Sequence, residues 1–177
     1  MASASEPSAR LLLIVTGSTL RAEEMDRPLA YYLKQQIDRA LSETIAQGRD
    51  GLEGYVVRVV ADFRWIHDEP LQGWPTISLG GPGVNALAHR WLEEVPVSLA
   101  VSERYFIQMD PDLAEPRASI WGMDNATTQI AVSVFVDRFL PRFLDRCATL
   151  TLPFNLTEGD HESGTGLDLD EEGDDDE

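Results

Sequence analysis

Three short stretches of this 177-residue chain combine glycine with side chains that can bond a ligand. They are residues 16–21, residues 80–85 and residues 122–128. Glycine lets the backbone approach a ligand closely and adopt a positive φ. The hydroxyl, amide, carboxylate and guanidinium groups beside these glycines can hold a polar ligand.

The stretch from Gly80 to Asn85 reads Gly-Gly-Pro-Gly-Val-Asn and predicts a turn from a buried strand into a helix. Free backbone N–H groups at a helix start bind ligands, and Gly80, Gly81, Gly83 and Asn85 are the candidates here. Asn85 either bonds a ligand or holds the neighbouring loop, and the glycines equally suit a tight turn without a ligand. The stretch is neither the phosphate-loop motif nor the spaced dinucleotide motif, so it indicates a place and no reaction.

The candidates in the first stretch are Gly17, Ser18, Thr19 and Arg21. Hydroxyl and backbone N–H groups could hold an anion here, with Arg21 as the counter-charge. Serine and threonine are also common turn residues. Carboxylates follow at positions 23, 24 and 26, which disfavours a phosphate and gives Arg21 alternative partners.

The candidates in the third stretch are Asp124 and Thr128. Their polar groups either cap a helix or face a cleft shared with the glycine turn. The sequence offers no catalytic residue set, because His67, His89 and His161 have no Ser or Cys partner in a recognised motif. It also contains no metal-ligand spacing. Cys147 lies in a helical pattern, which predicts a small buried hydrophobe.

Each of these stretches follows a predicted strand. Apolar runs predict strands at 11–15, 55–60 and 76–79, and a short strand pair at 105–109 and 117–121. Helical spacing predicts helices at 26–47, with Asp26 as the cap, from about 84 to 93, and at 126–147, where Pro141 should kink or split the helix. Residues 67–70 read as a loop. The alternation predicts a three-layer α/β fold with a largely parallel sheet, whose strand ends share one cleft.

Charge and composition indicate the domain limits, the kind of partner and the cellular location. We expect a single domain at 10–156, a disordered N-terminus at 1–9 and a disordered acidic tail at 157–177. The net charge is −17, and eleven of the 31 acidic residues lie in that tail, which has no lysine or arginine. This charge disfavours nucleic-acid and membrane-surface binding. One cysteine and the absence of a spanning apolar run predict a cytoplasmic protein.

Two resemblances add expectations. The turn at Gly80–Asn85, the following strand pair and Gly122–Ala131 resemble archaeal surface-layer-type α/β domains over residues 76–140, which implies a structural, non-catalytic module. Residues Gly17–Ala30 resemble the first phosphate loop of flavodoxin-like flavin reductases. That resemblance implies that Ser18, Thr19 and Arg21 bind the phosphate of FMN.

The leading hypothesis is therefore a cytoplasmic, non-catalytic binding or assembly module. Its partner would be a small molecule or a protein, held in the cleft between the three stretches. The alternative is a flavin- or nucleotide-dependent enzyme that uses the same cleft, with FMN as its cofactor. The ligand, the partner and the oligomeric state stay open.

Overall fold

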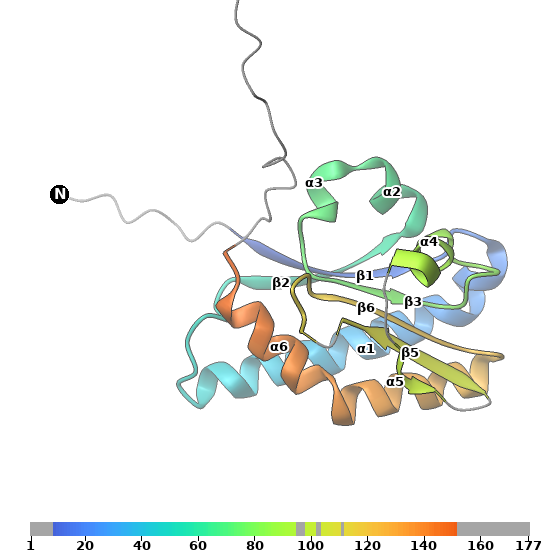
Figure 1. Cartoon of the computed structure of the whole chain (residues 1–177). Coiled ribbons are helices and arrows are strands. Elements are labelled where there is room, and N and C mark those ends of the chain that lie inside the picture. The colour runs from blue at the N-terminus through green and yellow to red at the C-terminus, as the bar shows by residue number, and fades with distance from the viewer. Residues whose placement is uncertain (1–8, 95–97, 102–103, 111, 152–177) are drawn as a thin grey trace, which may run out of the picture.

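The computed structural model describes residues 9–94, 98–101, 104–110 and 112–151. It is a three-layer α/β fold in which helices cover both faces of one sheet (Figure 1). The fold class predicted from the sequence is therefore confirmed. The segments predicted to be disordered, 1–9 and 157–177, lie outside the described residues apart from Ala9.

The sheet is six-stranded, in the order β2-β1-β3-β6-β5-β4. Four strands are parallel: β1 (Arg10–Thr16), β2 (Tyr55–Ala61), β3 (Thr76–Leu79) and β6 (Arg117–Gly122). The predicted pair is antiparallel and consists of β5 (Tyr105–Met109) and β6. The sequence did not reveal β4 (Ser98–Val101), which is antiparallel to β5.

The strand order reverses beside β1. The chain moves from β1 to β2 on one side and later returns to β3 on the other side. Crevices at such switch points, beyond the carboxyl ends of the strands, are where open α/β sheets bind ligands. The turns after β1 and β3 flank this point.

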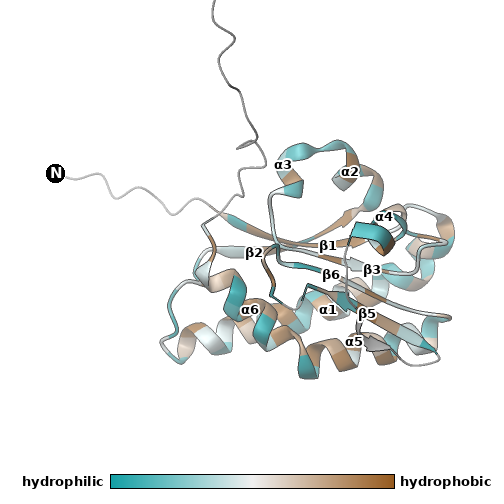
Figure 2. Cartoon of the chain, viewed as in Figure 1, coloured by the Kyte–Doolittle hydropathy of each residue, from teal (hydrophilic) through white to brown (hydrophobic). Residues whose placement is uncertain are grey.

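Helices α1 (Leu20–Ala46), α5 (Asn125–Arg138) and α6 (Leu140–Thr149) lie on one face of the sheet. On the other face lie α2 (Asp62–His67), α3 (Glu69–Gln72) and α4 (Ala86–Glu94). Helices α1 and α6 alternate between teal and brown turns, as expected where one side packs on the sheet (Figure 2). No helix in the described ranges is long and apolar enough to cross a membrane.

Two sequence expectations about helices need correction, and a third is confirmed. Helix α1 begins at Leu20 with Thr19 as its cap, so Asp26 lies inside the helix and does not cap it. Residues 62–67 and 69–72 form two short helices where we expected a loop at 67–70. The predicted helix at 126–147 is split at Phe139, and Pro141 lies in the first turn of α6, which confirms the expected break.

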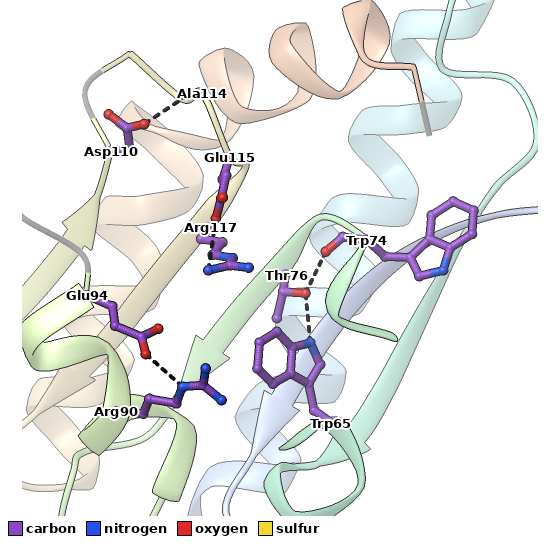
Figure 3. Close-up of polar contacts among 9 residues, drawn as sticks. All are labelled: Trp65, Trp74, Thr76, Arg90, Glu94, Asp110, Ala114, Glu115 and Arg117. Atoms are coloured by element: carbon purple, nitrogen blue, oxygen red, sulfur yellow. Dashed lines mark hydrogen bonds and ion pairs between the residues drawn. The ribbon is translucent and has the colours of Figure 1, made fainter. Parts of the chain in front are cut away.

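Polar contacts join α2 to the amino end of β3, close to Arg117 at the amino end of β6 (Figure 3). The indole Nε1 of Trp65 donates to Thr76 Oγ1 at 3.1 Å, and Thr76 Oγ1 donates to the carbonyl of Trp74 at 2.8 Å. The Arg117 guanidinium lies 5.9 Å from the Trp65 ring centre and pairs with Glu115 at 2.9 Å. This end of the sheet is a packed structural core.

Candidate functional site

A cleft opens at the carboxyl end of the parallel strands. Its volume is about 300 Å³, at the lower end of the range for small-molecule pockets. It is bounded by the start of α1, the turn between β3 and α4, and the turn between β6 and α5. The lining residues are Arg21, Met25, Asp26, Gly81, Pro82, Gly83, Val84, Trp121, Gly122, Met123, Asp124, Asn125 and Thr128.

Two glycines permit the second turn to approach the first turn and α1 closely. A Cβ on Gly17 would collide with the backbone carbonyl of Val84, so the first and second turns are in direct backbone contact. Gly80 has a φ of +102°, and a Cβ there would lie 2.6 Å from Asp26 Oδ2. Side chains at these two positions would push the second turn away from α1.

Half of the candidate residues from the sequence line the cleft. These are Arg21, Gly81, Gly83, Asp124 and Thr128. The other five are not among the residues that line it: Gly17, Ser18, Thr19, Gly80 and Asn85.

Asn85 holds the second turn from inside the protein. Its side chain is fully buried, and its Nδ2 donates to the carbonyls of Val15 at 3.1 Å and Leu79 at 3.0 Å. Its Oδ1 accepts from the backbone N–H groups of Leu87 and Ala88 at the start of α4. Of the two roles that the sequence left open, the geometry therefore favours holding the loop.

Thr19 and Asp124 cap the two helices that border the cleft. Thr19 Oγ1 accepts from Ala22 N at 3.3 Å, and Asp124 Oδ1 accepts from Thr127 N at 2.8 Å. The hydrogen bond from Thr127 N holds the pKa of Asp124 below its ordinary value. Thr128 is buried, and its Oγ1 accepts from Gly122 N, which fixes the third turn. These oxygens are thus committed to the fold.

Asp26 is the functional candidate that the sequence reasoning missed. It is only 7% exposed, it lines the cleft, and no described residue donates a hydrogen bond to its carboxylate. Burial raises its pKa from 3.8 to about 6, and the nearby Arg21 guanidinium partly offsets this increase. Perturbed carboxylates in clefts are candidates for functional groups.

A sequence signal for Asp26 did exist. The buried stripe of α1 runs through Ala22, Asp26, Ala30, Leu33, Ile37 and Leu41. A carboxylate on an apolar stripe at helical spacing is unusual unless it is paired or functional. The signal was missed because we placed the helix start at Asp26 itself, which turned a buried position into a cap.

The cysteine and the histidines lie outside the cleft lining. Cys147 is buried, and burial raises the pKa of its thiol to about 12, so it stays protonated and unreactive at neutral pH. His67 packs against Phe63 with ring centres 4.7 Å apart, and His89 is exposed. His161 lies outside the described residues. Among those described, no group of three or more His, Cys, Asp or Glu side chains could hold a metal ion.

The sequence was compared with protein-family models and with curated proteins. No protein-family model and no curated protein sequence matches the chain. The resemblances to surface-layer-type domains and to flavodoxin-like flavin reductases therefore stay predictions.

Proposed function

We propose that this protein is a binding module that holds a small ligand in the cleft between α1, the β3–α4 turn and the β6–α5 turn. The observation that carries the proposal is the Asp26 carboxylate, buried against the cleft without a hydrogen-bond donor from the described residues. A buried carboxylate without a partner costs stability, and a bound ligand that supplies a donor would remove this cost.

In this proposal the protein binds its ligand and does not catalyse a reaction. Besides Asp26, the described lining contains one carboxylate, Asp124, whose Oδ1 caps α5, and no His, Glu, Lys, Cys or Tyr, which are the other side chains that serve as general acids or bases. We further propose a cytoplasmic setting, which the single buried thiol of Cys147 supports, since lone cysteines suit reducing compartments.

A flavin-binding protein is the second candidate. One observation favours it: the cleft lies at the switch point beside β1, where flavodoxin-like folds hold FMN. The carboxylates count against it, because Asp26 and Asp124 both line the cleft and would repel a phosphate. FMN bound to the purified protein would show as yellow colour with flavin absorbance bands.

Mass spectrometry of small molecules released from the purified full chain tests the binding proposal. We expect a stoichiometric compound from the natural protein and several-fold less from Gly83→Val. Gly83 is exposed, and nothing lies within 4 Å of the position of its Cβ, so valine fits sterically while it narrows the cleft. The thermal midpoint should change by less than about 2 °C.

Ala46→Val is the matched control, because it adds bulk at an exposed position at the opposite end of α1. This variant should retain the compound. If the natural protein carries no compound, or Gly83→Val retains as much as the control, the cleft is not the binding site. If Gly83→Val unfolds, the turn is structural.

A further inference from the structure

We propose that the ligand is a compact cation that presents amine or amidine N–H groups to Asp26. This inference rests on the proposed function and specifies the chemistry of the same cleft. The argument starts from what surrounds the carboxylate. Asp26 is only 7% exposed, and it lines the cleft.

No described cationic side chain forms an ion pair with the Asp26 carboxylate. From its own helix, Arg21 lies close enough to influence it but forms no ion pair with it within 4.0 Å. The β3–α4 turn contributes only uncharged residues, with Gly80 packed against Oδ2. From the β6–α5 turn comes Asp124, whose carboxylate caps α5 and is influenced by Arg104. Asp26 therefore has unused capacity to accept N–H donors.

The rest of the lining suits a flat or compact cation. Trp121 lines the cleft, and its ring stacks on Phe106 with ring centres 4.2 Å apart, which holds it in place. Aromatic rings attract cations, and the thioethers of Met25 and Met123 provide adaptable apolar contact. An anion would instead meet the carboxylates of Asp26 and Asp124, and Arg21 is the one cationic side chain among the residues that line the described cleft.

Benzamidine and benzoate are probes that test this inference, because they have nearly the same shape and opposite charge. Each is titrated into the full chain at pH 7.5, with the backbone amide signals of Gly81, Gly83 and Asn125 as the NMR readout. We expect benzamidine to shift these signals and benzoate to leave them in place. Asp26→Asn should weaken benzamidine binding about tenfold or more, since a charge-assisted hydrogen bond is lost.

Glu24→Gln is the matched control, since it removes an exposed charge from the same helix start and should change the affinity less than about twofold. Lowering the pH to 5 should weaken binding to the natural protein, because Asp26 becomes protonated. Binding to Asp26→Asn should change little with pH.

The inference is overturned if benzamidine leaves the cleft signals unshifted, if benzoate shifts them instead, or if Asp26→Asn binds benzamidine as well as the natural protein. The proposed function is judged separately, by the compound that copurifies. An anionic copurifying compound lost in Gly83→Val would support the cleft as a binding site and reject this assignment of its chemistry.

Discussion

Two buried aspartates near the same end of the sheet have opposite surroundings. Asp62, 4% exposed, accepts from Phe63 N and Ala86 N, both at 2.7 Å, and so joins the end of β2 to the start of α4. Asp26, 7% exposed, accepts from no described donor. The two carboxylates are similarly buried but differ in their hydrogen bonds. Asp62 therefore stabilises the fold, whereas Asp26 lowers its stability.

The difference divides the carboxyl end of the sheet into two regions. At the start of α4, Asp62 and Asn85 together satisfy the backbone N–H groups of Ala86, Leu87 and Ala88. At the cleft, the Asp26 carboxylate of α1 accepts from no described donor. An unbonded buried carboxylate is a local departure of the kind that is expected at functional sites.

The largest expected effect is at Asn85. Replacing it by alanine removes all of its buried hydrogen bonds and strands the carbonyls of Val15 and Leu79. We expect Asn85→Ala to lower the free energy of unfolding by about 3–5 kcal/mol. Urea denaturation measures this, with the exposed Asn125→Ala as control, whose change should stay within about 0.5 kcal/mol. Equal effects of the two variants would show that Asn85 is not the anchor of the turn.

Asp62→Ala should have the next largest effect. It leaves the N–H groups of Phe63 and Ala86 without their acceptor and removes a negative charge from the start of α4. The expected loss is about 2 kcal/mol, measured by the same denaturation. Asp38→Ala is the control, since that carboxylate forms a solvent-exposed pair with Lys34 and should contribute less than about 1 kcal/mol. A gain in stability for Asp62→Ala would contradict the comparison.

The place of the cleft was predictable from the sequence, while the contacts of its polar side chains were not. Glycine-containing stretches after buried strands identify the carboxyl end of a parallel sheet, and topology brings such ends together. Whether a polar side chain in these stretches faces a ligand depends on where the next turn lies. Asn85 faces inward because its side chain donates to the carbonyls of Val15 and Leu79. Val15 is 70 residues earlier in the chain, so its position beside Asn85 cannot be read from the local sequence.

The missed elements have similar causes. Strands β3 and β4 both have four residues, but β3 ends at the glycine turn of Gly80 and Gly81, whereas no such turn signal follows β4. Helix α1 begins before Pro28, and proline led us to place the helix start near it. That single boundary error concealed the buried position of Asp26, so the most informative residue of the cleft was assigned to a cap.

Asp26→Asn has the smallest expected effect and the opposite sign. The folded-state pKa of Asp26 is about 6, above the 3.8 of an ordinary aspartate, so the folded state binds the proton more tightly than the unfolded state. Stability contributed by this group is therefore present at low pH and lost as the pH rises from about 4 to 6.

At pH 7.5, without added ligand, Asp26→Asn should be more stable than the natural protein by about 1–2 kcal/mol. The shift itself corresponds to about 3 kcal/mol, and the unbonded amide of the new asparagine reduces the gain. At pH 4 the gain from the pKa shift is nearly absent while the cost of the unbonded amide remains, so Asp26→Asn should there be less stable than the natural protein by about 1–2 kcal/mol. Glu24→Gln should show no such change with pH. Denaturation at both pH values measures this. If Asp26→Asn destabilises the protein at pH 7.5 as Asp62→Ala does, then Asp26 is a structural carboxylate and the contrast between the two regions disappears. If Asp26→Asn stabilises the protein at pH 7.5, the carboxylate does not serve the fold, and ligand binding is the physical reason for its presence.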